Sequence, residues 1–259
     1  VKMCNWCYQV IDYCNFNRET VHIALSYLDR FLSTKSGRPY LQDAALFQLA
    51  TITTLYMAIK LFEPIGLEVR LVSVLSRDCY TEKQVTDMEM KIFIALGWRM
   101  HMIPTPLAFV EHLIALLPAS VNGPTRKRLT DIARHQTELS VIDYYFTKHQ
   151  INSSIIAVSA ILNGMDSGGR NNASTFWYRP YLCKLREVLG CDLEMQQVNQ
   201  VRAKLWRALT QCAGEDQRVA TLLGPSRHYC MMDQKIGSIS PGCVSRRSVY
   251  TQSACNDTK

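Results

Sequence analysis

The residues best suited to chemistry are few and widely spaced. Cys4 and Cys7 form a CxxC pair, but no second pair is present to complete a zinc site. The two cysteines share one face of an expected helix, so we expect small buried side chains and no metal. Asp143 and His149 lie on either side of an expected helix end and turn. Since the sequence has no glycine-rich phosphate loop, GxSxG elbow or HExxH pair, we expect neither an enzyme nor a cofactor.

Three charged residues lie on helical faces that are otherwise apolar. Lys60 ends the nearly uncharged segment LQDAALFQLATITTLYMAI, and Glu89 and Asp29 have apolar neighbours three or four positions away. A buried unpaired charge is costly, so each should reach water or a partner. Lys60 could simply close a surface helix, where the helix dipole favours a cation, and Glu89 could lie at a solvated edge. The other interpretation is that these charges interact with a partner molecule outside the chain.

The elements that must position these residues are helices. Apolar residues recur with helical period almost throughout, and no segment alternates like a strand. Residues 43–62 are apolar nearly all round, which predicts a central buried helix. Thr81 and Gln84 form a capping box, and Thr105 followed by Pro106 is a strong helix start. Besides a first helix with the CxxC pair, the expected helices cover residues 18–34, 43–62, 68–77, 82–97, 106–117, 125–139, 152–164, 179–189 and 193–212.

The predicted fold class is therefore all-α, with two five-helix domains and a tail. We place the domains at residues 1–103 and 104–212. The polar segment 213–259 is expected to be a disordered tail. Its Ser240-Pro241 dipeptide is the minimal site for proline-directed phosphorylation.

Composition excludes several classes of protein. Of the 259 residues, 47% are hydrophobic and 20% charged, which is typical of a soluble globular protein. The net charge of +7 is spread along the chain, so we expect no direct nucleic-acid binding, and we interpret Arg126-Lys127-Arg128 as a solvated helix start. The sequence has no uninterrupted apolar stretch of eighteen residues, so we expect no membrane span. Ten scattered cysteines without a secretory signal favour a reduced intracellular compartment, and the start at Val1 suggests a fragment of a longer protein.

The segments WCYQV, NRETVHIALSYLDRFLS, AIKLFEP and YTEKQVTDMEMKIFIALGWRM, followed by PTP, together resemble a cyclin. The resemblance covers residues 1–212 and is more specific in the first half, where YLDRFLS is closer to cell-cycle than to transcriptional cyclins. It implies two tandem cyclin folds. It also implies a nuclear or cytoplasmic regulatory subunit that binds a cyclin-dependent Ser/Thr kinase and moves the kinase's mobile helix into its active position in cell-cycle control.

The resemblance also implies a kinase-binding site. Lys60 and Glu89 match the residues that contact the kinase main chain, beside a groove between residues 43–62 and 82–97 that receives an amphipathic helix. We therefore expect Lys60 and Glu89 near each other, partly exposed, on the rim of an apolar surface. The matching apolar positions are Met57, Leu61, Phe93, Trp98 and Met100.

A second surface implied by the resemblance docks short basic-hydrophobic motifs of substrates and inhibitors. Its positions match Met3, Trp6, Gln9, Phe47 and Gln48. Gln9 replaces the usual acid, which should weaken selection for a basic motif residue. These residues could equally pack the first helix on the core, since a shallow apolar patch has both explanations.

The sequence departs from the family at one structural charge. Asp29 matches an aspartate whose arginine partner would fall immediately before Val1, so we expect Asp29 to lack that partner. Two alternatives to a kinase regulator stay open: a transcription factor IIB-like protein that binds DNA and polymerase, and a cyclin-fold scaffold without a kinase.

Overall fold

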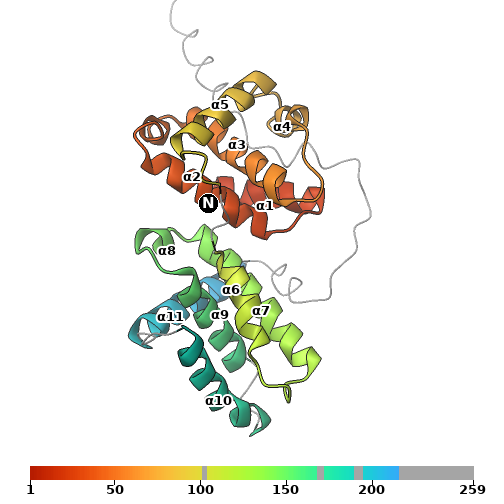
Figure 1. The fold of residues 1–259 in the computed structure, drawn as a ribbon, viewed down its shortest axis with the longest axis vertical. Helices are drawn as coiled ribbons and strands as arrows, with labels where there is room; N and C mark the ends of the chain where they lie inside the picture. The colour runs from red at the N-terminus through yellow and green to blue at the C-terminus, as the bar shows by residue number, and fades with distance from the viewer. Residues whose placement is uncertain (101–103, 168–171, 190–194, 216–259) are drawn as a thin grey trace, which may run out of the picture. The chain divides into compact units, whose positions relative to one another are not determined.

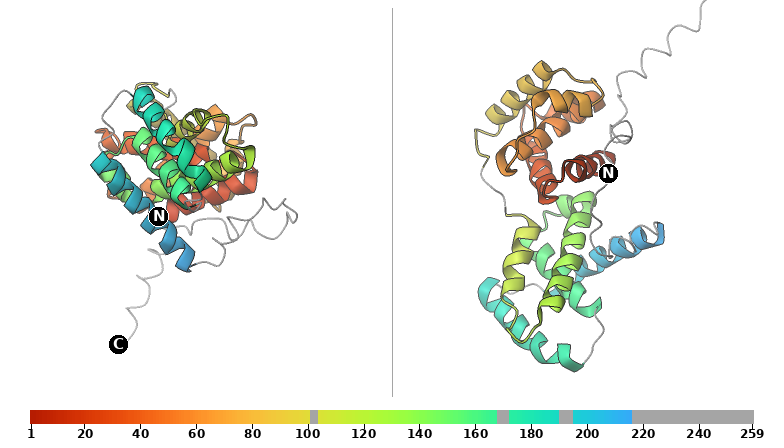
Figure 2. Two further views of the ribbon diagram at one scale, coloured as in Figure 1. Left: turned by 90° about the horizontal axis from the view of Figure 1, so that it is seen from below. Right: turned by 90° about the vertical axis from the view of Figure 1, so that its right-hand side faces the viewer.

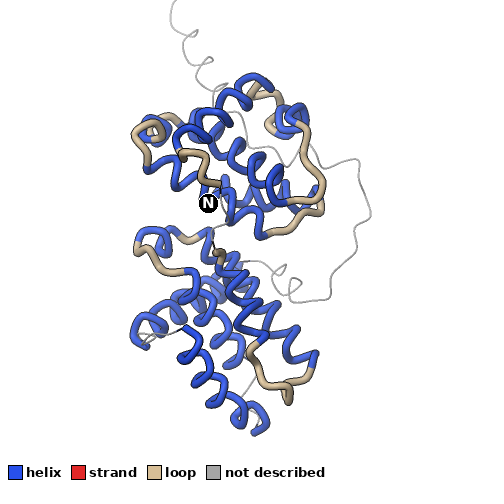
Figure 3. Tube along the Cα trace, viewed as in Figure 1, coloured by secondary structure: helices blue, strands red, loops and turns tan. Residues whose placement is uncertain are grey.

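The structure is a computed structural model that describes residues 1–100, 104–167, 172–189 and 195–215. In this described part, helices are joined by loops and no strand is present, as Figure 3 shows. The predicted all-α fold is therefore confirmed. Contacts group the described helices into two units, residues 1–100 and residues 104–215.

Unit 1 is built around one buried helix. Its elements are α1 (Lys2–Cys14), α2 (Glu19–Ser33), the 3₁₀ turn η1 (Arg38–Leu41), α3 (Ala44–Phe62), α4 (Val69–Leu75) and α5 (Glu82–Ala95). Helix α3 lies in the middle of the unit, among α1, α2, α4 and α5 (Figures 1 and 2). Every residue from Gln48 to Ile59 is buried, which confirms the prediction of a central helix.

Helix α3 is also the one helix of the described residues that is long and apolar enough to cross a membrane. Most of it is covered by protein, since 67% of its most apolar window is buried. A core helix of this composition passes the same test of length and hydropathy, so the finding is weak support for a membrane span.

Local signals explain where the helices of unit 1 begin. The Asp43 carboxylate accepts hydrogen bonds from the backbone N–H groups of Ala45 and Leu46, which caps α3. The predicted capping box at the start of α5 is present, because Thr81 and Gln84 each bond the other's backbone. These caps fix the ends of the two helices that carry Lys60 and Glu89.

Gly37 allows the chain to turn closely after α2. A Cβ atom at this position would lie 2.0 Å from the carbonyl oxygen of Phe31 and 2.6 Å from its carbonyl carbon. Both are backbone atoms, so they cannot move aside as a flexible side chain would. The expected loop therefore packs directly against α2 and continues into η1.

Unit 2 contains α6 (Pro106–Ala115), α7 (Gly123–Ile142), α8 (Tyr144–Lys148), α9 (Ser153–Ser167), α10 (Asn172–Leu189) and α11 (Met195–Glu215). Helix α9 packs against α6, α7 and α11. The Thr105 hydroxyl accepts from the Ala108 N–H, and Pro106 begins α6, so the predicted start is confirmed.

Three details of unit 2 differ from the prediction. Helix α8 was expected to be a turn, but Asp143 caps it, and five residues are too few to show a helical period. Helix α10 begins at Asn172, and Pro180, a residue typical of a first turn, lies inside it. Helix α11 continues to Glu215, so the first residues of the predicted tail are helical. The rest of that tail, with Ser240, lies outside the described residues.

Arg126 corrects the interpretation of the basic cluster at the start of α7. Its guanidinium is partly buried and donates hydrogen bonds to the carbonyls of Ile114, Leu117, Pro118 and Val121, at 2.8 to 3.1 Å. These carbonyls belong to the end of α6 and the loop after it, beyond the region where each carbonyl has a helical partner four residues on. Arg126 is thus a structural arginine, and not part of a solvated helix start.

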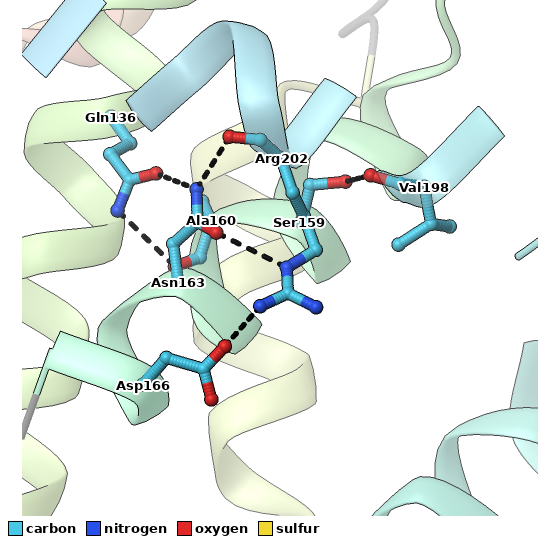
Figure 4. A network of polar contacts seen from close by, with 7 residues as sticks. All are labelled: Gln136, Ser159, Ala160, Asn163, Asp166, Val198 and Arg202. Carbon is cyan, nitrogen blue, oxygen red and sulfur yellow. Dashed lines mark hydrogen bonds and ion pairs between the residues drawn. The ribbon is translucent and has the colours of Figure 1, made fainter. Parts of the chain in front are cut away.

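A network of polar side chains, buried at Gln136 and Asn163, ties α11 to α9 and α7 (Figure 4). The Asn163 amide donates to Gln136 Oε1 at 2.8 Å and to the Arg202 carbonyl at 3.0 Å, and its oxygen accepts from Arg202 Nε at 3.1 Å. Arg202 also pairs with Asp166, and Gln136 donates to the Ala160 carbonyl. Because these contacts need one register of the three helices, the network specifies how they pack.

Candidate partner-binding site

Lys60 and Glu89 meet between α3 and α5. Lys60 Nζ lies 3.1 Å from Glu89 Oε1 and 3.4 Å from Oε2, in the last turn of α3 and the middle of α5. The Nζ atom also lies 5.5 Å from the centre of the Tyr56 ring. The hydrogen bond from Lys60 to Glu89 raises the pKa of the lysine, against a smaller lowering by burial. Lys60 is therefore held as a cation.

The two partners differ in exposure. The Lys60 side chain is 51% exposed and that of Glu89 only 11%. We expected both to be partly exposed, and for Glu89 this is wrong, because it is mid-helix and pairs with Lys60 on the side that faces α3. The ammonium is consequently the accessible member of the pair, and the carboxylate holds it in place.

Apolar side chains beside this ion pair are exposed to solvent. Leu61 is 45% exposed and Trp98 is 62% exposed. The Trp98 ring stacks on Phe93, with centroids 4.8 Å apart and planes 18° from parallel. Phe93 lies one turn after Glu89 on the same face of α5. A large apolar area on the surface of a monomer is typical of an interaction site.

The structure adds two residues that the sequence analysis missed. Met90 is 50% exposed and Ile94 is 64% exposed, although both are apolar and lie within α5. They are four residues apart, so they share a face, and Met90 is three residues before Phe93. The signal was present in MEMKIFIAL, where apolar residues occur on more than the core-facing side. We call the combined surface the α3–α5 face; it comprises Lys60, Leu61, Glu89, Met90, Phe93, Ile94 and Trp98.

Two expected members of this site have other positions. Met57 is fully buried beneath the surface, because it faces the core three residues before Lys60, so it supports the site without being accessible. Met100 is partly buried, and its carbonyl accepts a hydrogen bond from the Tyr27 hydroxyl at 3.0 Å. The binding role of the α3–α5 face stays a prediction.

The expected docking patch divides into covered and open residues. Trp6 is 4% exposed and Gln48 is 3% exposed, so both pack in the core, as the alternative explanation required. Met3 and Phe47 are partly exposed and Gln9 is exposed. Trp6 Nε1 and Gln48 Nε2 are buried without a hydrogen-bond partner, which is unusual for polar atoms inside a protein.

The remaining candidate residues are Asp29 and the two cysteines of the CxxC pair. Asp29 is exposed, and the expectation that it lacks its arginine partner stays a prediction. Cys7 is buried and Cys4 partly buried, and both are free thiols. No group of three or more possible metal ligands occurs in the described part of the chain.

Comparison with known proteins identifies the domain family of unit 1. Residues 2–101 match the model of the cyclin N-terminal domain, so the match covers all of unit 1 except Val1. The chain is 26% identical to a cyclin-F3-2 protein of Oryza sativa subsp. japonica over 236 residues, covering 87% of this chain and 54% of that protein. It is 26% identical to the G1/S-specific cyclin-D1 of Xenopus laevis over 190 residues, covering 72% of this chain and 61% of that protein. Residues 2–101 thus form a cyclin N-terminal domain, and the chain spans about half the length of these relatives.

Solved structures show the same fold. A viral cyclin from herpesvirus saimiri superposes with a TM-score of 0.62 at 18% identity, over 80% of this chain and 84% of that one. A chain from the CAK complex of Chaetomium thermophilum, bound to ATP-gamma-S, superposes with a TM-score of 0.52 at 12% identity, over all of this chain and 79% of that one. At these identities the likeness establishes the fold alone.

Proposed function

We propose that this chain binds a cyclin-dependent Ser/Thr kinase through the α3–α5 face and raises the activity of that kinase. The observation that carries the proposal is the Lys60–Glu89 ion pair, held at the meeting of α3 and α5 among exposed apolar side chains. The match to the cyclin N-terminal domain supports the class of partner. The chain itself supplies binding energy and no catalytic group.

The apolar part of the face suits an amphipathic helix. Leu61, Met90, Ile94 and Trp98 each expose at least 45% of their surface. Burying such side chains is worth about 25 cal/mol for each Å² of apolar surface. Trp98 is the natural anchor, since tryptophan is enriched among the residues that dominate binding energy.

Lys60 would determine the orientation of a helix bound to this face. Glu89 occupies one side of the ammonium, and the exposed half of Lys60 leaves it able to donate to carbonyl groups of a partner. The carbonyls at the C-terminus of a helix lack internal partners and carry partial negative charge. Lys60 would therefore orient the incoming helix with its C-terminal end toward α3, and Glu89 would act through Lys60.

The test uses a panel of recombinant cyclin-dependent kinases, with a Ser-Pro peptide as phosphate acceptor. At least one kinase should bind the whole chain and gain activity. Lys60→Ala and Trp98→Ala should each weaken binding at least 10-fold, as expected for central interface residues. Lys127→Ala, which removes an exposed lysine of unit 2, is the matched control and should bind like the unchanged chain.

Two results would overturn the proposal. The first is a panel in which no kinase binds. The second is equal binding by the Lys60→Ala, Trp98→Ala and Lys127→Ala chains. DNA binding that weakens steeply with salt would instead support the transcription factor IIB-like interpretation, and a folded chain that binds neither kinase nor DNA would support the scaffold.

The two unpaired donors favour a second role, the docking of short substrate or inhibitor motifs. Buried Trp6 Nε1 and Gln48 Nε2 each lack an acceptor, and a peptide carbonyl would supply one once the side chains that cover these atoms move aside. Trp6→Phe keeps an aromatic ring while removing the N–H donor. We expect it to lower phosphorylation of motif-bearing substrates while leaving that of a short Ser-Pro peptide unchanged. An equal effect on both substrates would mean that Trp6 only packs the core.

A further inference from the structure

The turn that presents Trp98 has an unfavourable backbone conformation. Gly97 and Trp98 follow α5 with φ angles of 59° and 60°, both in the left-handed region. Glycine enters this region freely, but a residue with a bulky side chain does so at a cost. Such conformations persist where surrounding structure enforces them.

Local hydrogen bonds account for the first part of the turn. The Gly97 N–H donates to the Ile94 carbonyl at 3.0 Å, and the Trp98 N–H donates to the Phe93 carbonyl at 2.9 Å. These bonds end α5 in the way typical of a left-handed helix terminus. Local bonds continue beyond Trp98, since the Arg99 N–H donates to the Leu96 carbonyl at 3.2 Å and the Met100 N–H to the Trp98 carbonyl at 3.0 Å. The carbonyls of Arg99 and Met100 are held by contacts from another helix.

Two side chains of α2 supply those contacts. The hydroxyl of Tyr27, a fully buried residue, donates to the Met100 carbonyl at 3.0 Å. Arg30 Nη2 donates to the Arg99 carbonyl at 2.7 Å. Tyr27 and Arg30 are three residues apart, so they lie on one face of α2 and reach two consecutive carbonyls.

We propose that Tyr27 and Arg30 are positioning residues for the binding surface, which hold the strained turn so that the Trp98 indole stays stacked on Phe93 and exposed to the partner. A side chain fixed in its bound orientation loses less conformational entropy on binding. This inference rests on the proposed function, because it makes Trp98 a prearranged anchor for the kinase helix. It assigns a role in binding to α2, a helix that contributes nothing to the α3–α5 face itself.

Tyr27→Phe is the sharpest variant, because it removes one hydroxyl and keeps the buried ring. The first measurement is fluorine NMR of the whole chain labelled with 5-fluorotryptophan. The chain has four tryptophans, so the spectrum has four signals, and the Trp98→Phe chain identifies the one from Trp98. Tyr27→Phe should shift or broaden the Trp98 signal and leave the other three in place. Arg30→Met should do the same.

Tyr80→Phe is the matched control. It also removes a buried tyrosine hydroxyl that donates to a backbone carbonyl, here of Ala45 at 2.8 Å, at the start of α3. It should leave the Trp98 signal unchanged. A general loosening of unit 1 would move that signal in both variants, whereas a specific clamp responds to Tyr27→Phe and Arg30→Met alone.

The second measurement is a double-mutant cycle on binding to a kinase from the panel. Tyr27→Phe should weaken binding roughly 3- to 10-fold when Trp98 is present, the usual range for one hydrogen bond, and have no effect in the Trp98→Ala chain. A purely structural role would give the same loss in both backgrounds. An unchanged Trp98 signal, or equal losses in the two backgrounds, would overturn the inference.

The two proposals fail separately. If Lys60→Ala loses kinase binding while Tyr27→Phe neither moves the Trp98 signal nor changes binding, the clamp is wrong and the function stands. If no kinase binds the unchanged chain, the function is wrong. A Trp98 signal that still responds to Tyr27→Phe and not to Tyr80→Phe would then support the clamp as a property of the turn.

Discussion

The two units treat buried polar groups in different ways. In unit 2, the amides of Gln136 and Asn163 are buried and bonded to each other and to the neighbouring helices. In unit 1, Trp6 Nε1, Gln48 Nε2 and Thr53 Oγ1 are buried without a partner. A satisfied network favours one arrangement of helices, and an unpaired group lowers stability. The buried hydrogen bonds of unit 2 thus favour one packing of its helices, whereas unit 1 retains buried polar atoms without a hydrogen-bond partner.

The two units also differ in how many large apolar side chains they expose. In the described residues of unit 2, the exposed large apolar side chains are scattered, at Tyr144, Val188 and Trp206. In unit 1 they are more numerous. Val1, Leu41 and Leu46 lie before the middle of α3, and the others lie between the end of α3 and the turn after α5, at Leu61, Ile65, Leu71, Val74, Met90, Ile94 and Trp98. Unpaired donors and exposed apolar side chains are both unfavourable in an isolated protein. Both features are more frequent in the described residues of unit 1 than in those of unit 2.

The largest expected effect tests whether unit 1 is nevertheless closely packed. Gly37→Ala would place a methyl group 2.0 Å from the Phe31 carbonyl oxygen, so α2 and η1 must separate. We expect a loss of about 4 kcal/mol in the free energy of unfolding, measured by urea denaturation. Gly66→Ala, where no atom lies within 4 Å of the new methyl, should change stability by less than about 0.5 kcal/mol. Equal stability of the two variants would show that the turn is loose.

The second prediction breaks the network of unit 2. Asn163→Ala removes three hydrogen bonds and leaves Gln136 Oε1 and Arg202 Nε without the partner that Asn163 supplies. We expect a loss of about 3 kcal/mol, with faster hydrogen exchange in α7, α9 and α11 and little change in unit 1. Asn199→Ala, at an exposed position of α11, should not lower stability. A small effect of Asn163→Ala would mean that the amide network is not what orders unit 2.

The third prediction concerns the effect of acid on the stability of unit 1. Burial lowers the pKa of His22, on α2, from its ordinary 6.5 to about 4. Between these values the unfolded chain binds a proton that the folded chain does not, so stability falls as the pH falls from about 6.5 to about 4. We expect unit 1 to lose roughly 2 kcal/mol over this range, measured by hydrogen exchange at each pH. His22→Asn should flatten the dependence, and an unchanged slope would assign it to other groups.

The smallest expected effect is a gain in stability, whereas the previous three are losses. Thr53 Oγ1 is buried without a partner, so Thr53→Val should stabilise unit 1 by about 1 kcal/mol in urea denaturation. Thr54 is the matched residue one position later, whose hydroxyl donates to the Thr51 carbonyl at 2.9 Å. Thr54→Val should therefore be neutral or destabilising. If both variants gained stability equally, the pairing of these hydroxyls would not distinguish them.

Much of the fold could be predicted because the signals are local. The apolar run over residues 43–62, the capping box at Thr81 and the Thr105-Pro106 start each depend on a few adjacent residues, and the structure confirms all three. The meeting of Lys60 and Glu89 was expected from family resemblance, since a helical period alone cannot say which helices are neighbours.

What could not be predicted depends on contacts between distant residues. The sequence shows Arg126 as one of three basic residues, and the carbonyls that it binds are identified only by the turn between α6 and α7. The burial of Met57 and the exposure of Met90 likewise follow from where neighbouring helices lie. Asn163 was not recognised, because a polar residue in an apolar helix shows neither its partners nor whether it has any.

The Arg126 contacts also constrain how this part of the chain can vary. The side chain has a fixed length, and it joins the first turn of α7 to the end of α6 through four carbonyls. Surface loops commonly accept insertions and deletions. Here an inserted residue would carry some of those carbonyls out of reach, leaving a partly buried guanidinium with fewer acceptors. The connection between these helices should therefore tolerate changes of residue type far better than changes of length.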